Sequence, residues 1–346
     1  MYISQVNRHG GDVFGKEIDL DFSSNINPEG MPTPVKEAII NAAENCAAYP
    51  DPYCRRLREG ISALEGVPCG QILCGSGAAE LIYAFAFSLP EDRPVLIVSP
   101  TFCEYQAAAE AAGITCELYA LPEETGFRLT GDILLNDLDR YGAVFLCTPN
   151  NPTGVTVEPD ILRAIADTGV RVLADMCFLD LTDDPDKYDI PGLIEKYPNI
   201  TVLKAFTKSY AMAGVRLGFA MCSDEDFLLT MSKKTQCWNV SSIAQQAGEA
   251  ALNCCAWLKS SVRQISAERD RLTRELSSFG ITVYPSKANY LLLYCEADLY
   301  ELLLQRRILT RDCSDYEGLS RGYVRIAVRT RAENDILLSA IKEVIE

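Results

Sequence analysis

Three polar motifs constrain the fold of this chain most, because each one directly follows a strand-like apolar run. Asn150–Gly154 follows the run 143–147, and the other two motifs are Asp175 and Lys208. In an open α/β sheet the carboxyl ends of the strands meet at one crevice, where ligands bind. We therefore expect the three motifs to lie together. Taken singly, each is compatible with a turn residue or a surface charge.

These residue types match the needs of pyridoxal phosphate chemistry. An aspartate beside the pyridinium nitrogen keeps it protonated, so that the ring can accept electrons. An amide such as Asn151 donates to the ring oxygen, and a lysine amine bonds the aldehyde. Arg216 follows Lys208 by eight residues in a Gly-x-Arg-x-Gly setting, and a nearby cation lowers the pKa of a lysine. The sequence therefore predicts a pyridoxal phosphate site with Lys208 and Asp175 as catalytic residues.

Further segments carry a resemblance to a known family. They are His9–Gly11, Asp21–Pro28, Tyr284–Leu293, Ile308–Cys313 and Tyr323–Arg329. With the three motifs, they resemble the fold-type I pyridoxal phosphate enzymes of the histidinol-phosphate aminotransferase branch. Within that branch they look most like the threonine-phosphate decarboxylases. The resemblance covers nearly the whole chain.

The resemblance implies decarboxylation of O-phospho-L-threonine to aminopropanol phosphate, which is used to build the cobalamin side chain. Histidinol-phosphate aminotransferase, or a related class I/II amino-acid aminotransferase, remains the alternative, because the aminotransferase shares most of the motifs. Phe178 favours the decarboxylase, since aminotransferases of this superfamily commonly have a tyrosine there that bonds the ring oxygen. A non-catalytic regulator on this fold would need an extra DNA-binding segment, for which this acidic chain has no room.

The cofactor phosphate needs a cradle. Cys74–Glu80 runs from a short strand into a helix, where glycines allow close backbone approach and free amides favour an anion. A plain strand-to-helix turn has the same pattern. Family members usually carry a serine where this chain has Ala205, so one phosphate hydrogen bond is expected to be missing. With the resemblance, the expected cofactor-binding residues are Gly77, Ala78, Ala79, Phe102, Asn151, Asp175, Thr207, Lys208, Arg216 and, from the neighbouring subunit of a homodimer, Tyr49.

The substrate implied by the resemblance carries a carboxylate and a phosphate, and guanidinium groups bind both well. Arg325 matches the carboxylate-binding arginine of the family. Arg311 is expected to hold the phosphate, together with His9 and Asn25. Either arginine is also compatible with a surface ion pair. His9 is the only histidine and the 14 cysteines include no Cys-x-x-Cys pair, so neither a histidine-based nucleophile system nor a metal site is predicted.

Composition indicates a cytoplasmic enzyme with small-molecule substrates. The formal net charge of −16 over 346 residues disfavours nucleic acid and acidic membrane surfaces as partners. Met1–Gly11 has no apolar core, so no secretory signal is expected. The longest apolar stretch, Leu81–Leu89, is too short to span a bilayer.

Alternating helical and strand-like patterns predict an α/β fold. Strand-like runs lie at 95–99, 115–119, 143–147, 170–174, 201–205 and 217–222, with helical patterns around them. This favours a large cofactor-binding domain over 31–245, with a mostly parallel sheet covered by helices. Residues 246–346 indicate a smaller α+β domain. The resemblance adds 1–30 to it, which makes the small domain discontinuous.

Overall fold

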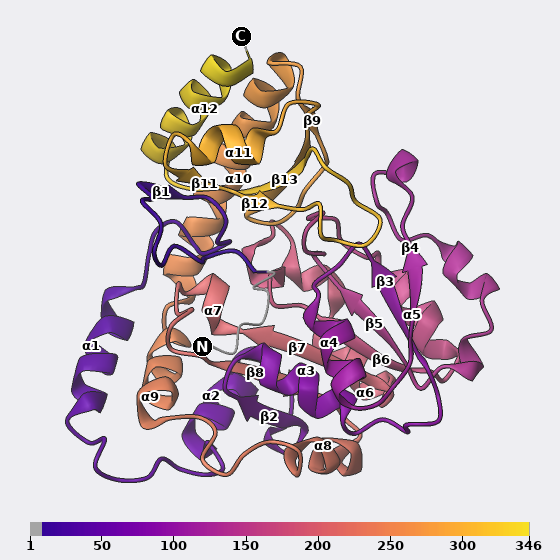
Figure 1. The fold of residues 1–346 in the computed structure, drawn as a ribbon. Coiled ribbons are helices and arrows are strands. Elements are labelled where there is room, and N and C mark those ends of the chain that lie inside the picture. The colour runs from indigo at the N-terminus through magenta and orange to yellow at the C-terminus, as the bar shows by residue number, and fades with distance from the viewer. Residues whose placement is uncertain (1–8, 346) are drawn as a thin grey trace, which may run out of the picture.

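A computed structural model describes residues 9–345, and its centre is a seven-stranded sheet (Figure 1). The strand order is β2-β8-β7-β6-β5-β3-β4, and β8 runs in the direction opposite to the other six strands. The strands are β2 (Ile72–Gly75), β3 (Val95–Ser99), β4 (Cys116–Ala120), β5 (Ala143–Cys147), β6 (Arg171–Asp175), β7 (Ile200–Ala205) and β8 (Gly218–Met221). The expected mostly parallel α/β sheet is confirmed.

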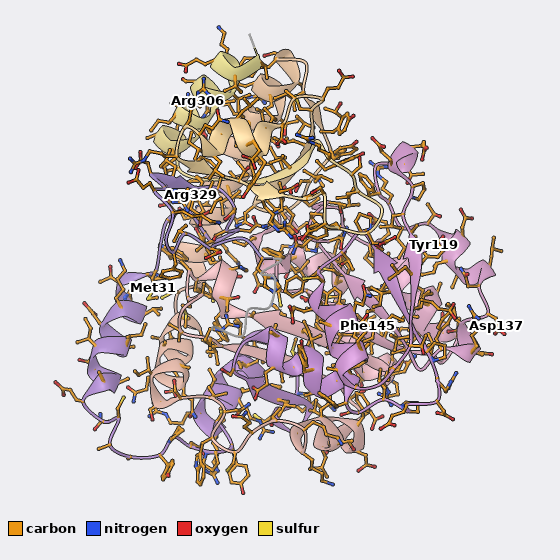
Figure 2. All side chains as sticks on the ribbon, viewed as in Figure 1. Met31, Tyr119, Asp137, Phe145, Arg306 and Arg329 are labelled. Atoms are coloured by element: carbon orange, nitrogen blue, oxygen red, sulfur yellow. The ribbon has the colours of Figure 1, made fainter. Side chains whose placement is uncertain are left out.

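The central strands of this sheet, such as β3 and β5, are buried on both faces, which explains why they are continuously apolar rather than alternating. The edge strand β4 is only partly buried. Val144 and Leu146 of β5 pack into one core, and Ala143 and Phe145 into another on the opposite face. Phe145 is labelled in Figure 2. The helices of this part are α1 (Thr33–Ala43), α2 (Arg55–Glu65), α3 (Ala78–Ala86), α4 (Glu104–Ala111), α5 (Pro159–Asp167), α6 (Ile190–Lys196), α7 (Phe206–Ser209), α8 (Glu225–Ser232) and α9 (Ser242–Ala251). Short 3-10 helices lie at Cys69–Gln71, Glu123–Thr125, Gly131–Leu135, Leu138–Arg140, Leu179–Leu181 and Pro185–Tyr188.

A second, smaller layer lies at the top of Figure 1. It contains an antiparallel sheet of order β12-β13-β10-β9, and β1 pairs in parallel with β11. The elements are β1 (Leu20–Asp21), β9 (Thr282–Val283), β10 (Tyr290–Tyr294), β11 (Ile308–Leu309), β12 (Arg311–Asp312), β13 (Tyr323–Ala327), α10 (Cys255–Ser278), α11 (Leu299–Leu304) and α12 (Arg331–Ile345). The division into domains at residues 30 and 245 stays a prediction.

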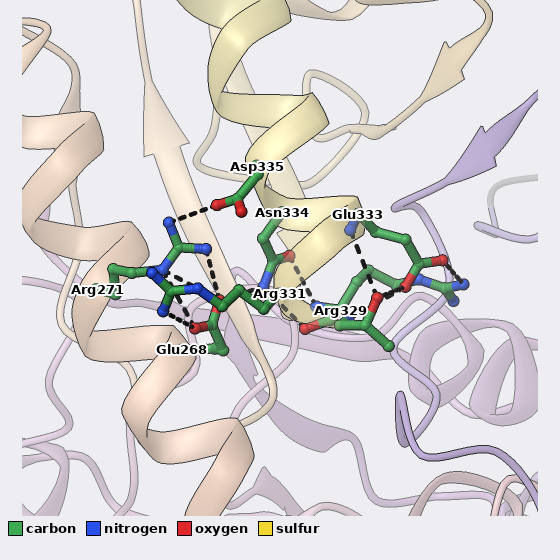
Figure 3. A network of polar contacts seen from close by, with 8 residues as sticks. Glu268, Arg271, Arg329, Arg331, Glu333, Asn334 and Asp335 are labelled. Carbon is green, nitrogen blue, oxygen red and sulfur yellow. Dashed lines mark hydrogen bonds and ion pairs between the residues drawn. The ribbon is translucent and has the colours of Figure 1, made fainter.

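A polar network joins α10 to α12 (Figure 3). Glu268 accepts hydrogen bonds from Arg271 and Asn334, and it also pairs with Arg331. Arg271 reaches across to Asp335, with 2.8 Å between Nη1 and Oδ1. Glu268 and Arg271 are largely buried, whereas Asp335 and Arg331 are more exposed. The network therefore connects the two helices through a partly buried centre. Within residues 9–345, no helix is long and apolar enough to cross a membrane.

Candidate active site

A cavity of about 410 Å³ lies at the carboxyl ends of β5, β6 and β7. Asp175 is the last residue of β6, and Lys208 lies in α7, directly after β7. The three motifs from consecutive strands therefore share one cavity, as their positions predict. Its lining includes these expected site residues: His9, Asn25, Ala78, Ala79, Phe102, Asn151, Asp175, Thr207, Lys208, Arg216 and Arg325.

Asp175 has both carboxylate oxygens fixed. Its Oδ2 accepts a hydrogen bond from the Tyr105 hydroxyl at 2.8 Å, and its Oδ1 accepts one from the Cys177 amide at 2.9 Å. Asp175 and Tyr105 are both buried. The carboxylate thus lies in one orientation on the cavity wall. Phe102 packs edge-on against Tyr105, with 5.7 Å between ring centroids.

Asn151 and Arg325 contact each other on another wall. The Arg325 guanidinium donates to Asn151 Oδ1 and, at 2.6 Å, to the Ser23 carbonyl oxygen. Tyr316 lies 3.5 Å from the same Asn151 oxygen. Because Oδ1 is occupied, the Asn151 amide nitrogen is the group that remains for a ligand. Asn25 Oδ1 is buried without a hydrogen-bond partner among the described residues, as in a site that a polar ligand completes.

Lys208 has an unusually low basicity. Its pKa is lowered to about 8, first by burial and then by the charges of Arg325 and Arg216, against the opposing charges of Cys177 and Asp21. A buried ammonium beside two guanidinium groups loses its proton more readily than one in water. A substantial fraction of Lys208 is therefore a neutral, nucleophilic amine near pH 8.

The start of α3 forms a tight cradle with Arg216. Gly77 has φ +82°, and a Cβ there would lie 2.6 Å from Arg216 Nη2. Gly218 of β8 lies close to the start of α3, and a Cβ added at this glycine would lie 2.7 Å from the Ala78 amide nitrogen. Free amides, a guanidinium and the Thr207 segment thus surround one space. This arrangement suits an anion, since the first turn of a helix carries unpaired donors and a partial positive charge.

Comparison with known proteins decides the family. Residues 17–341 match the family described as aminotransferase class I and II. The chain belongs to this family. It is 39% identical to threonine-phosphate decarboxylase of Salmonella typhimurium, over 97% of this chain and 96% of that one. Histidinol-phosphate aminotransferase of Methanococcus maripaludis is 30% identical, over 94% and 90%. The histidinol-phosphate aminotransferase structure from Clostridium acetobutylicum superimposes with a TM-score of 0.88 at 28% identity, over 94% and 99%.

Class I and II aminotransferases use pyridoxal 5'-phosphate, and the cavity fits this cofactor. The α3 cradle suits the phosphate, Asp175 suits the ring nitrogen, and Lys208 lies on the same cavity. The expected family and cofactor are confirmed. Burial raises the pKa of the Cys147 and Cys177 thiols, so both fit a packing role better than a catalytic one.

Three expected site residues do not line the main cavity: Gly77, which lies at the α3 cradle, Arg311 and Tyr49. Arg311 lines an adjacent cavity of about 180 Å³, which shares Phe102 and Tyr316 with the first. Its Nη2 contacts both oxygens of Asp315 at 2.9 Å. Tyr49 is 78% exposed and stacks on Trp238, with 4.4 Å between ring centroids. The cofactor contact expected of Tyr49 across a dimer stays a prediction.

Several residues that line this cavity were not predicted from the sequence. Glu104 and Tyr105 line the cavity from the first turn of α4, and Ser23 and Tyr316 contact it from distant segments. The sequence signal that could have identified Glu104 and Tyr105 is their position two and three residues after Phe102, an expected cofactor-binding residue. Ser23 lies within the segment Asp21–Pro28 that carries the resemblance, but neither Ser23 nor Tyr316 was predicted as a site residue.

Proposed function

We propose that this chain is a pyridoxal 5'-phosphate-dependent lyase that decarboxylates O-phospho-L-threonine to aminopropanol phosphate for the cobalamin side chain. The observation that carries this is the 39% identity, over nearly both full lengths, to a threonine-phosphate decarboxylase. The geometry supports it with cations on the main cavity and on the cavity beside it. The enzyme is proposed to be a cytoplasmic homodimer.

Residues of α3, β6 and α7, together with Arg216 of the loop before β8, would hold the cofactor. The α3 amides of Ala78 and Ala79, with Thr207 and Arg216, would bind its phosphate. Asp175, whose carboxylate is fixed by two hydrogen bonds, would pair with the ring nitrogen. When bound, pyridoxal 5'-phosphate supplies an electron-accepting ring that stabilises the negative charge left at the substrate α-carbon. The remaining proposed contacts are Gly77 at the cradle, Phe102 against the ring, Asn151 at the ring oxygen and the partner's Tyr49 at the phosphate.

Substrate recognition divides between two cationic groups. Arg325 binds the carboxylate, since its guanidinium reaches the main cavity beside Asn151. Arg311 binds the phosphate, together with His9 and Asn25. Phe102 and Tyr316, which border both cavities, form the wall over which the substrate extends.

Lys208 moves the proton. With a pKa of about 8, its free amine is basic enough to hold a proton at Nζ near neutral pH. From the same cavity, Nζ would deliver that proton to the substrate α-carbon once carbon dioxide has left. Phe178 is buried, lines the cavity and packs on Tyr290, so no hydroxyl at this position bonds the ring oxygen.

A histidinol-phosphate aminotransferase, or a related class I/II amino-acid aminotransferase, is the second candidate. The Methanococcus maripaludis relative and the Clostridium acetobutylicum structure favour it. The two reactions use the same cofactor residues and differ in the bond broken at the α-carbon. Substrate turnover therefore has to distinguish them.

The deciding experiment offers purified holoenzyme O-phospho-L-threonine, and separately histidinol phosphate with 2-oxoglutarate. Release of carbon dioxide without a keto acid supports the decarboxylase. Glutamate formation from the second mixture supports the aminotransferase instead. Lys208→Ala is the matched control, because it removes the amine that both reactions need. Absence of both products from a cofactor-loaded enzyme contradicts both assignments.

A further inference from the structure

Glu104 connects two elements at the cavity. Its Oε1 lies 2.9 Å from His9 Nε2, and its Oε2 accepts a hydrogen bond from the Tyr83 hydroxyl at 3.1 Å. Tyr83 lies on α3, Glu104 on α4, and His9 before the first strand. His9 and Glu104 both line the cavity. One carboxylate thus ties the amino-terminal segment to the helix that begins at the phosphate cradle.

The charge of His9 depends on two neighbouring side chains, Cys103 and Glu104. Hydrogen bonds to Cys103 and Glu104 raise the pKa of His9 to about 9, and the bond to His9 lowers the pKa of Glu104. At neutral pH the two form an imidazolium–carboxylate pair. A lone carboxylate on this wall would repel an anionic substrate. Paired with an imidazolium, it does not, and the remaining ring N–H faces Cys103.

That second ring nitrogen is the one suited to an anion. His9 Nδ1 lies 4.0 Å from Cys103 Sγ, and a thiol is a weak hydrogen-bond partner. A phosphate oxygen is a far stronger acceptor for a charged donor. Phosphate can therefore replace the thiol at Nδ1, while Nε2 stays on Glu104. Cys103 also borders the cavity that Arg311 lines, which places His9 and Arg311 around the same residue.

We propose that Glu104 is a positioning residue for substrate recognition: it holds His9 as an imidazolium whose Nδ1–H binds the substrate phosphate. This rests on the proposed function, since it assumes a phosphorylated substrate.

A metal ion bound by His9, Cys103 and Glu104 fits the geometry less well than this hydrogen-bonded arrangement. The ligand atoms of His9, Cys103 and Glu104 lie within 4.8 Å of one another. However, Glu104 and Cys103 contact different ring nitrogens, and one ion cannot bind both.

The first test uses the fact that His9 is the only histidine in the chain. After removal of any affinity tag, the imidazole NMR signals of the holoenzyme report His9 alone as pH is varied. Glu104→Gln keeps an acceptor at this position but removes the charge. We expect its titration midpoint to fall by at least about one pH unit, and that of Tyr83→Phe to fall less. Glu110→Gln, on the same helix but bonded to Gln106, should leave the midpoint unchanged.

The second test measures KM for O-phospho-L-threonine against pH. In Glu104→Gln, KM should rise about tenfold per pH unit above the lowered midpoint, while kcat changes little. Glu104→Asp should restore part of the pH range. A midpoint that falls in Cys103→Ala but not in Glu104→Gln overturns the proposal, and so does an unchanged KM profile.

The two tests separate this inference from the proposed function. If the midpoint shifts but no variant, nor the unchanged enzyme, releases carbon dioxide from O-phospho-L-threonine, the pairing stands. The decarboxylase assignment and the phosphate role then both fail. If the enzyme decarboxylates and neither midpoint nor KM responds to Glu104→Gln, only the role of Glu104 fails.

Discussion

Tyr105 donates its hydroxyl hydrogen to Asp175 Oδ2 at 2.8 Å, which joins the first turn of α4 to the end of β6. Burial, and then the charge of Asp175, raise the pKa of Tyr105 well above its usual value. The phenol therefore stays protonated and keeps donating at any working pH. The Asp175 carboxylate is held in place before any ligand arrives, as preorganised electrostatic stabilisation requires.

Replacing Asp175 by alanine should slow the chemical step by roughly two to three orders of magnitude, because the ring then accepts electrons poorly. Tyr105→Phe should cost less, about tenfold, since it removes one orienting hydrogen bond. Single-turnover release of carbon dioxide measures both. Asp167→Asn, at an exposed position, is the control. Near-normal turnover in Asp175→Ala would show that Asp175 only forms a turn.

Borohydride reduction of the holoenzyme should attach a pyridoxyl group to Lys208, because its amine bonds the cofactor aldehyde. Peptide mass spectrometry locates the label. Lys208→Ala should lose turnover and this label while retaining some cofactor through the α3 cradle. A label on Lys204, four residues earlier and buried in ion pairs with Glu65 and Asp180, would contradict the assignment.

The reactivity of Lys208 should depend on pH with a midpoint near 8. Burial and the charge of Arg325 lower its pKa to about 8, and only the unprotonated amine is a nucleophile. In cofactor-free protein, acetylation of Lys208 by acetic anhydride should therefore rise as pH increases through about 8. Arg325→Gln removes a nearby cation and should move the midpoint upward. Competitive labelling against exposed Lys233 provides the reference. An unchanged midpoint in Arg325→Gln would show that Arg325 does not lower the pKa of Lys208.

Gly218→Ala should weaken cofactor binding by tenfold or more. The added Cβ would lie 2.7 Å from the Ala78 amide nitrogen. Because that nitrogen belongs to the backbone, the start of α3 would have to shift to relieve the clash. Overpacking of this kind costs about 1–3 kcal/mol. Gly214→Ala is the matched control, because within residues 9–345 no heavy atom beyond its own chain neighbours lies within 4 Å of the added Cβ. Fluorescence titration with pyridoxal phosphate measures the affinity. Equal affinities in the two variants would contradict cofactor binding at the start of α3.

Sequence reasoning predicted the elements that local patterns encode. The runs 95–99 and 143–147 coincide with β3 and β5, because both strands are buried on both faces and their apolar runs end at polar motifs. The shared cavity of Asn151, Asp175 and Lys208 followed from strand order in an α/β sheet. The two-residue strands β1 and β11 had no pattern long enough to recognise.

Contacts between distant segments could not be predicted in the same way. Arg325 reaches Asn151 across 174 positions, and its partner is set by how β13 lies over the main sheet. The bonds of Glu104 to His9 and Tyr83 depend on how α3 and α4 face the amino-terminal segment. Side-chain pairing of this kind arises from tertiary packing, which residue types alone do not specify.

The roles of Arg311 and Arg325 can be separated with two ligands, O-phospho-L-threonine and threonine. Arg311 lies in the adjacent cavity, where Asp315 orients its guanidinium. If it binds the phosphate, Arg311→Ala should weaken binding of the phosphorylated ligand by about 1.5–3 kcal/mol and leave threonine almost unchanged. Arg325→Ala should weaken both, because both ligands carry the carboxylate.

Calorimetric titration of the two ligands into holoenzyme measures these losses, under conditions where turnover is blocked by Lys208→Ala in every variant. Arg321→Ala is the control, since Arg321 is exposed and pairs only with Asp298 among the described residues. Arg311→Ala also frees Asp315, whose uncompensated charge adds repulsion of the phosphate, so Arg311→Ala with Asp315→Asn isolates the lost guanidinium contact. Equal losses on threonine and its phosphate in that double variant would refute phosphate binding by Arg311. The phosphate would then have to be bound by the other proposed residues, His9 and Asn25.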